Sequence, residues 1–148
     1  MVKKLINNLV ICAPNINEGG PLTILNEAIN SAKKKFPNTN IIIIANSKKI
    51  LNVKNSKRIN ILEFPNSKKS WMQRLIHEYY VFKKLSVRLN VDIWISLQDV
   101  TTIVQAKYQT VYCHCPIPFY NLKLIDIYHE PSSLVRNLLY NFIYKLNI

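Results

Sequence analysis

The chain has 148 residues, 49% of them hydrophobic, and its 20 basic residues outnumber the 8 acidic ones to give a net charge of +12. This length suffices for about one domain with a buried core, and the hydrophobic content excludes a disordered chain. The charge predicts attraction to anionic metabolites or membranes, whereas nucleic acid is not an expected partner because the scattered basic residues accompany no recognition motif.

The first predicted element is a buried β-strand at 9–13, which ends at Pro14. The basic start and apolar stretch before it faintly mimic a signal peptide, but Asn7 and Asn8 interrupt the apolar part and no small-residue cleavage site follows. The longest aliphatic run, at 41–45, is far shorter than the roughly 20 residues of a membrane-spanning helix. The chain is therefore expected in the cytoplasm.

An amphipathic helix is predicted to follow, with Pro21 in its first turn. Its apolar residues recur at intervals of three and four: Leu22, Leu25, Ile29, Ala32 and Phe36. A second strand is predicted at 40–45 and a third at 59–64, stopped by Pro65. The continuous aliphatic run in the second strand is typical of a parallel sheet that helices cover.

A long helix is predicted at about 70–89, followed by strands at 91–97 and 109–113 and a last helix at 133–146. The apolar face of the long helix consists of Trp71, Met72, Leu75, Ile76, Tyr79, Phe82 and Leu89. That of the last helix consists of Leu134, Leu138, Leu139, Phe142, Ile143 and Leu146. The alternation β-α-β-β-α-β-β-α predicts an open, mostly parallel α/β sheet.

Polar residues follow the predicted strands, where open α/β sheets bind ligands. In strand order these residues are Gly19 and Gly20, Asn46 and Ser47, Asn66 and Ser67, Gln98 and Asp99, and His114. Because the carboxyl ends of parallel strands meet at one edge, we expect these residues to gather there. This convergence indicates a binding site at that edge.

The two glycines of the chain, Gly19 and Gly20, lie side by side where the first helix begins. One interpretation is that their backbone amides approach an anion at the helix N-terminus. The other is a tight turn that needs a positive φ. The pair is neither a dinucleotide-binding fingerprint nor a P-loop, because the further glycines and the lysine of those motifs are missing.

The segment YCHCPIPFY, from Tyr112 to Tyr120, holds two of the three cysteines. Cys113 and Cys115 are too close for an ordinary disulfide, so reduced thiols are expected. They also give too few ligands for zinc, and they point away from His114 on an extended chain, which disfavours both a metal site and a Cys–His catalytic pair.

Two polar residues of these strand ends have open alternatives. His114 is either a hydrogen-bonding or proton-handling group or a structural histidine tied to a loop carbonyl. Asp99 is either catalytic or the cap of a helix over Thr102. His77 and His129, in or beside helices, are expected to be bystanders.

Four stretches resemble bacterial family 4 glycosyltransferases, and most closely those that build surface polysaccharides: EGGP, KSWMQRLIHEYYVFKKLS, DIWISLQD and VYCHCPIPFY. The resemblance covers nearly the whole chain and is densest between Glu63 and Tyr120. It implies the GT-B architecture, in which two Rossmann-like domains face each other across a cleft. It also implies an activated nucleotide sugar as donor, retention of anomeric configuration, and no metal or other cofactor.

The resemblance also implies roles for individual residues. The catalytic candidates are His114, which would face the transferred sugar, and Asp99. The substrate-binding candidates are Gly19, Gly20, Pro21, Gln98, Pro116 and Phe119, the glycines lying near the donor phosphates. Gln98 stands where the family has the histidine of L-H-D, and Cys115 and Ile117 stand where it has Asn and Ser.

The resemblance further implies that residues 1–148 are one Rossmann-like, N-terminal, acceptor-side half of such an enzyme. The C-terminal domain, which binds most of the donor, would then be missing through truncation or supplied by a second chain, and the chain alone would be inactive. The alternative is a non-catalytic half-domain that binds a sugar or a partner subunit. A nucleic-acid-binding domain rests on charge alone.

Because acceptors for surface polysaccharides are commonly lipid-linked, the resemblance implies a peripheral position at the inner face of the cytoplasmic membrane. The basic rims of the helices at 71–89 and 133–146 suit weak contact with anionic lipids. Their aromatic residues suited to an interface are Trp71, Tyr79, Tyr80, Tyr140 and Tyr144. The alternative is that both apolar faces pack within the protein.

Overall fold

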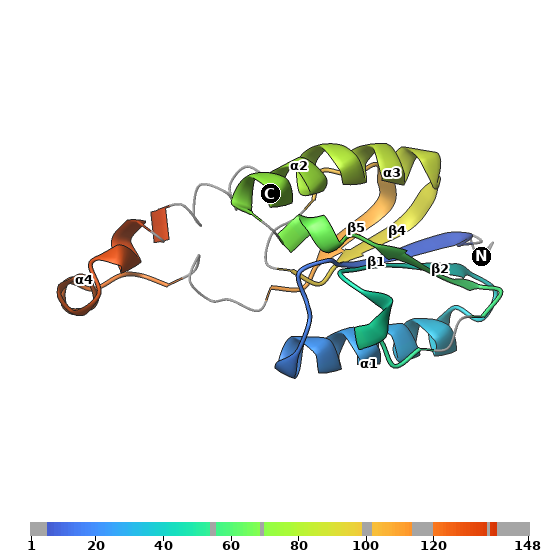
Figure 1. Cartoon of the computed structure of the whole chain (residues 1–148), viewed down its shortest axis with the longest axis horizontal. Helices are drawn as coiled ribbons and strands as arrows, with labels where there is room; N and C mark the ends of the chain where they lie inside the picture. The colour runs from blue at the N-terminus through green and yellow to red at the C-terminus, as the bar shows by residue number, and fades with distance from the viewer. Residues whose placement is uncertain are drawn as a thin grey trace, which may run out of the picture.

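A five-stranded, all-parallel sheet forms the centre of the protein (Figure 1). The computed structural model describes residues 6–53, 56–68, 70–98, 102–113, 120–135 and 137–138. The strands are β1 (Asn8–Ala13), β2 (Asn40–Ala45), β3 (Ile59–Glu63), β4 (Val91–Ser96) and β5 (Ala106–Val111). The predicted Rossmann-like class, an open α/β sheet with helices on both faces, is confirmed.

The strand order is β3-β2-β1-β4-β5, so the direction in which strands are added reverses between β1 and β4. β1 pairs in register with β2 on one side and with β4 on the other. In open α/β sheets, ligands bind outside the carboxyl ends of the strands at such a reversal. The topology therefore predicts a ligand site at the residues that follow β1 and β4.

Helices cover the two faces of this sheet (Figure 1). One face is covered by α1 (Gly19–Lys35), and the other by a continuous helical segment made of α2 (Trp71–Ile76), the π-helical turn η3 (His77–Val81) and α3 (Phe82–Arg88). Two short 3₁₀ turns, η1 (Lys48–Ile50) and η2 (Pro65–Lys68), follow β2 and β3.

Two apolar clusters join the helices to the sheet. Leu25 and Ile29 of α1 pack in one cluster with Leu9 and Ile11 of β1. Phe82 of α3 packs in the other cluster, where its ring centroid lies 6.1 Å from that of the buried Trp94. Since successive residues of β1 enter opposite clusters, the strand is buried on both faces, as its apolar sequence predicts. Each such side chain contributes about 1.5–3 kcal/mol on burial.

Asp92, on β4, links the start of β1 to β5 at the amino edge of the sheet. One of its carboxylate oxygens accepts hydrogen bonds from the backbone amides of Asn7 and Asn8, at 2.8 and 3.1 Å. The other pairs with the ammonium group of Lys107 on β5. These contacts, that of Lys107 first, lower the pKa of Asp92. This carboxylate therefore has a structural role far from the carboxyl edge.

The predicted apolar face of the long helix is partly wrong. Met72 and Ile76 are 67% and 44% exposed, whereas Glu78 is only 2% exposed. The physical reason is the π-helical turn at His77–Val81, whose i→i+5 bonds add a residue to the turn. That extra residue shifts the phase of the helix, so one continuous 3.6-residue pattern does not describe both ends.

The fifth strand and the part of the chain after it also depart from prediction. β5 begins at Ala106 rather than at 109 and is largely exposed. Residues 102–105 form no helix, so the interpretation of Asp99 as the cap of a helix over Thr102 is wrong. The short helix α4 (Leu124–His129) was not predicted and lies beyond the carboxyl edge of the sheet (Figure 1).

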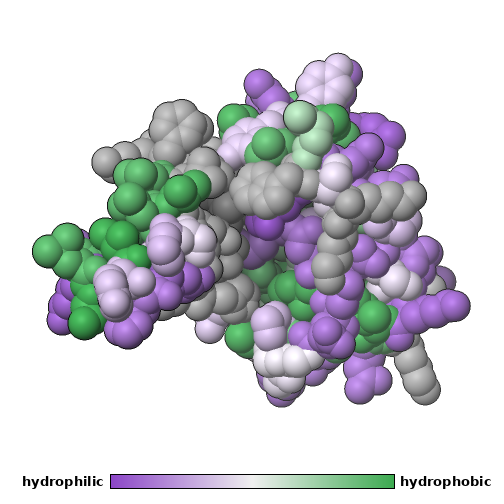
Figure 2. Space-filling model, turned by 60° about the vertical axis from the view of Figure 1, so that its left-hand side comes forward, coloured by the Kyte–Doolittle hydropathy of each residue, from purple (hydrophilic) through white to green (hydrophobic). Residues whose placement is uncertain are grey.

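The beginning of the predicted last helix is helical at 132–135 and 137–138, but its orientation differs from the prediction. Leu134 and Leu138 are 41% and 60% exposed, while Ser133 and Asn137 are buried. Figure 2 shows apolar side chains gathered on the part of the molecule beyond the carboxyl edge of the sheet, where Figure 1 places α4. The remaining residues of that helix lie outside the described ranges. Over the described residues, no helix is long and apolar enough to cross a membrane.

Candidate functional site

The residues that follow β1 and β4 meet at the point where the strand order reverses. Nδ2 of Asn15, two residues after β1, donates a hydrogen bond of 2.9 Å to Oε1 of Gln98, two residues after β4. Gln98 is buried. The predicted substrate-binding residue Gln98 therefore lies at the carboxyl edge, although its partner Asn15 was not predicted.

Gln98 also reaches a buried carboxylate beneath this edge. Its Nε2 donates to Oε1 of Glu78 at 3.0 Å, and Nε of Arg74 donates to the same oxygen at 2.8 Å. Burial raises the pKa of Glu78, and the charge and hydrogen bond of Arg74 oppose this effect without cancelling it. The result is a polar network of Asn15, Gln98, Glu78 and Arg74 between the sheet and the π-helical turn.

One atom of this network lacks a partner. Oδ1 of Asn15 is buried and accepts no hydrogen bond from any residue in the described part of the chain. An unsatisfied buried acceptor costs about 1–3 kcal/mol. A hydroxyl group of a ligand, or a water molecule, would remove that cost. The network therefore contains an unsatisfied buried acceptor close to the place where the topology predicts a ligand.

The N-terminus of α1 lies just after the same strand. Gly19 has a φ of +69°, which confirms the tight-turn interpretation for this glycine. Gly20 has a different environment, because a Cβ atom there would meet nothing within 4 Å. Glu18 makes no side-chain cap hydrogen bond to the helix, and the first turn holds no acidic residue. Glu18 therefore does not occupy the backbone amides at this end of the helix, where an anion is favoured, and Pro21 lies among them without a donor of its own.

Two serines from the predicted gathering have local structural roles instead. Oγ of Ser67 donates to the carbonyl of Phe64 at 2.8 Å and is buried. Oγ of Ser47 accepts from the amide of Lys49 at 3.3 Å and caps η1. These contacts close the ends of β3 and β2. Both serines nevertheless lie at the carboxyl edge, as predicted, and Oγ of Ser67 also donates to the carbonyl of Pro14, just after β1, at 3.5 Å.

The two catalytic candidates, Asp99 and His114, and the loop residues Pro116 and Phe119 lie outside the described residues. The described residues just before them still show where those two segments start. Gln98 precedes Asp99 directly, and the amide of Tyr112 bonds the carbonyl of Ser96 at 2.8 Å. Both segments therefore leave the sheet at its carboxyl edge, and the roles of the four residues stay predictions.

Of the two histidines in the described ranges, His77 belongs to the packing of its helix, and the ring of His129 contacts that of Tyr128 on α4. Nδ1 of His77 lies 2.7 Å from the carbonyl of Gln73, and its ring packs edge-on against Phe64 with centroids 5.8 Å apart. Burial raises the pKa of the Cys12 thiol, which disfavours a reactive thiolate there. Over the described ranges, no three His, Cys, Asp or Glu residues are grouped to hold a metal ion.

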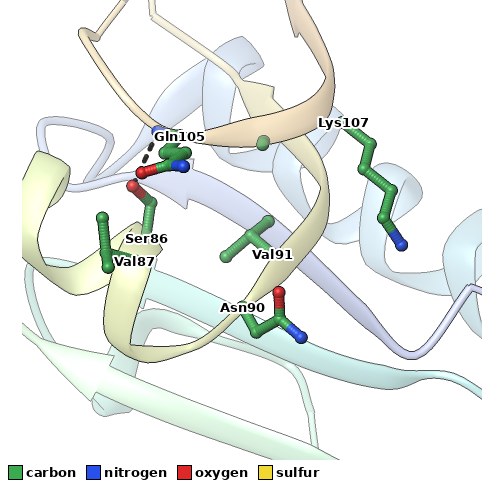
Figure 3. Close-up of a pocket in the computed structure, with 7 residues that line it drawn as sticks. Ser86, Val87, Asn90, Val91, Gln105 and Lys107 are labelled. Atoms are coloured by element: carbon green, nitrogen blue, oxygen red, sulfur yellow. Dashed lines mark hydrogen bonds between the residues drawn. The ribbon is translucent and has the colours of Figure 1, made fainter.

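A hollow of about 370 Å³ lies at the opposite, amino edge of the sheet (Figure 3). Oγ of Ser86, in its wall, accepts from the amide of Gln105 at 2.8 Å and donates to the carbonyl of Lys83 at 2.8 Å. Lys107, also in the wall, pairs with Asp92. Because these polar groups already satisfy one another, the hollow is a weaker candidate than the carboxyl edge.

Sequence reasoning missed Glu78, Arg74 and Asn15. A signal for the first two exists, since an acid four residues after an arginine on a helix lies next to it and can pair with it. Asn15 carries no such signal, because asparagine is common in turns after strands.

Comparison of the chain with protein-family models, with curated proteins and with solved structures finds no match.

Proposed function

We propose that the protein is the N-terminal, acceptor-side half of a glycosyltransferase, which transfers a sugar from a nucleotide sugar to a glycan or a lipid-linked acceptor. The observation that carries the proposal is the hydrogen bond between Gln98 and Asn15, whose Oδ1 is unsatisfied, at the reversal point of a parallel sheet, with the N-terminus of α1 following the same strand. The sequence resemblance supplies the reaction class.

In this proposal the site recognises the phosphate groups of the donor and the hydroxyl groups of a sugar through different atoms. The amides around Gly20 and the net charge of +12 attract phosphate groups of the donor. Oδ1 of Asn15 accepts a hydrogen bond from a sugar hydroxyl, while the contact with Gln98 orients the Asn15 side chain. Glu78 acts indirectly, because it accepts the hydrogen bond that holds Gln98 in place and does not itself bind the substrate.

The reaction itself would proceed with retention, and the nucleotide phosphate would be the leaving group. His114 and Asp99, on the segments that start at the same edge, are the proposed catalytic residues. Positive charge and helix dipoles stabilise such a leaving group, and much of that stabilisation would come from a donor-binding domain outside this chain. No metal is assigned to the reaction.

A second candidate is a half-domain that binds a sugar without transferring it. The unsatisfied Oδ1 of Asn15 and the polar residues at the carboxyl edge suit sugar binding without transfer equally well. The two candidates differ in turnover once a donor-binding domain is added.

The test is a transfer assay with labelled nucleotide sugars and lipid-linked acceptors. We expect no appreciable turnover from the chain alone and measurable turnover after a C-terminal half from a GT-B enzyme is added. In that mixture His114→Ala should lower turnover by about 10²-fold, the usual effect of losing one positioned polar or proton-handling group, while the matched variant Cys115→Ser changes it little. Sugar binding without turnover in every mixture would select the non-catalytic candidate.

A further inference from the structure

β5 forms one margin of the sheet, because the strand order leaves it a single neighbour, β4 (Figure 1). Its residues from Lys107 to Val111 are all exposed. Alternate residues of a parallel strand bond to the same neighbour, and the amide of Tyr112 donates to the carbonyl of Ser96 on β4. The amides and carbonyls of Lys107, Gln109 and Val111 therefore point away from the sheet, and no residue in the described ranges bonds to them.

Exposed strand margins of soluble proteins are ordinarily blocked by a proline, a bulge or a charged side chain. β5 contains no proline, and it keeps one register with β4 from Ala106 to Val111. Its single charged residue is Lys107, whose ammonium group pairs with the carboxylate of Asp92 in the same sheet. The outer margin of β5 is therefore open to a further strand.

The opposite margin of the sheet, formed by β3, differs in this respect. The amide of Ile41 on β2 donates to the carbonyl of Arg58, so the next residue, Ile59, points away from β2. The amide of Ile59 donates instead to the carbonyl of Ser56 at 3.0 Å, and the side chains of Ile59 and Ile61 are buried. The sheet is therefore extended more readily at β5 than at β3.

We propose that β5 pairs antiparallel with β5 of a second copy of the chain, so that the two sheets become one continuous sheet. A two-fold axis at Gln109 places this residue opposite its own copy and places Lys107 opposite Val111. Each such pair exchanges two backbone hydrogen bonds. No other symmetric register pairs all three outward-pointing residues with one another, and this one places no two like charges opposite each other.

The side chains on the other side of the strand fit the same register. Tyr108 faces Thr110 of the second copy and Tyr112 faces Ala106, so a large side chain meets a small one in every pair. Tyr108 and Tyr112 are 58% and 46% exposed in the single chain. The pairing covers both rings in each copy.

The net charge of +12 on each copy opposes the pairing at long range. Salt screens such repulsion over about 10 Å at 0.1 M, so the dimer should become tighter as salt rises. An acidic partner would behave in the opposite way, because salt weakens its attraction to the basic chain. This inference uses no residue of the carboxyl-edge network and does not depend on the proposed sugar transfer.

The first experiment is sedimentation equilibrium of the full chain at roughly 5–500 μM, since a contact one strand wide belongs to the weak class of interface. We expect a monomer–dimer equilibrium whose dissociation constant falls about threefold or more between roughly 0.05 and 0.5 M sodium chloride. Val111→Pro removes an amide that points away from β4, so it should weaken the dimer about tenfold or more while the thermal unfolding midpoint is kept. Val111→Thr keeps the amide and is the matched control, which should leave the dissociation constant unchanged.

An added charge tests the same contact without a proline. Tyr108→Lys places a cation beside the two-fold axis and should weaken the dimer by about fivefold or more. Tyr80→Lys, at a 59% exposed position of η3, adds the same charge away from β5 and should have little effect.

The register is tested by cross-linking in a chain that carries Cys113→Ser and Cys115→Ser. Tyr108→Cys mixed with Thr110→Cys should form an intermolecular disulfide under copper–phenanthroline oxidation, because the two Cα atoms face each other at about 4.5 Å. Either variant alone should give much less. A chain that stays monomeric at every concentration, a dimer that Val111→Pro leaves unchanged or that salt weakens, or equal cross-linking by either cysteine variant alone would overturn the proposal.

Discussion

Nε2 of Gln98 lies 3.0 Å from Oε1 of Glu78, and this buried hydrogen bond joins the end of β4 to the π-helical turn. The bond makes the carboxyl edge of the sheet depend on the helix that covers it. Arg74 completes the contact from the preceding turn of α2. A substitution of Glu78 should therefore alter both the stability of the protein and the position of the Gln98 side chain.

Glu78→Gln should change how stability depends on pH. Because burial raises the folded-state pKa of Glu78 above its ordinary value of 4.5, the favourable contribution of this group is fully present below that pH and is lost as the pH rises through the folded-state pKa. Glutamine does not titrate. The free energy of unfolding of the variant, relative to the wild type, should therefore rise between pH 4 and pH 7.

This difference is measured by urea unfolding at several pH values. Glu27→Gln, at an exposed position of α1, controls for the general effect of removing a carboxylate. A relative stability that falls with rising pH would mean that the attraction of Arg74 exceeds the cost of burial, contrary to the expectation.

The extent to which sequence predicts this fold depends on the burial of each element. β1 and β2 are apolar on both faces, and that signal identifies a parallel sheet directly. β5 is an exposed edge strand with alternating polar residues, so its sequence resembles a loop as much as a strand. The π-helical turn could not be predicted, because its extra residue is visible only in the hydrogen bonds that it changes.

The candidate site was predictable only in outline. The rule for open α/β sheets places the site at the carboxyl edge, and Gln98 is there. The rule does not say which of several polar residues are buried together, since that depends on side chains from β1, β4 and α2–η3 meeting in space. Ser67 and Ser47 fit the rule in sequence and nevertheless serve their own turns.

The two adjacent glycines should respond differently to alanine. Gly19→Ala forces a side chain into a φ of +69° and should cost about 1 kcal/mol of unfolding free energy. Gly20→Ala meets open space, so it should leave stability unchanged or raise it by up to about 1 kcal/mol. Chemical denaturation of both variants measures this. Equal destabilisation would mean that the turn also constrains Gly20.

Asp92→Ala should destabilise the amino edge by about 2–3 kcal/mol, because two backbone amides and Lys107 lose their partner. Asp92→Asn keeps an acceptor oxygen and should cost less. Since the folded-state pKa of Asp92 is lowered from 3.8, its contribution is present above that pH and is lost as the pH falls through the folded-state value. The Asp92→Asn deficit should therefore shrink in acid, and a deficit independent of pH would argue against the charged interaction.

The central claim is that the carboxyl edge where β1 and β4 end contributes the weaker part of donor binding, by contacting the phosphates and the sugar, while most of the donor affinity would come from a domain outside this chain. The most direct measurement is a backbone amide NMR titration of the chain with UDP-glucose and GDP-mannose at millimolar concentration. The account predicts saturable shifts at Asn15, Gly20 and Gln98, and unchanged signals from Asn90 and Gln105 at the amino edge. Shifts confined to the amino edge, or no saturable shift with either compound, would contradict it.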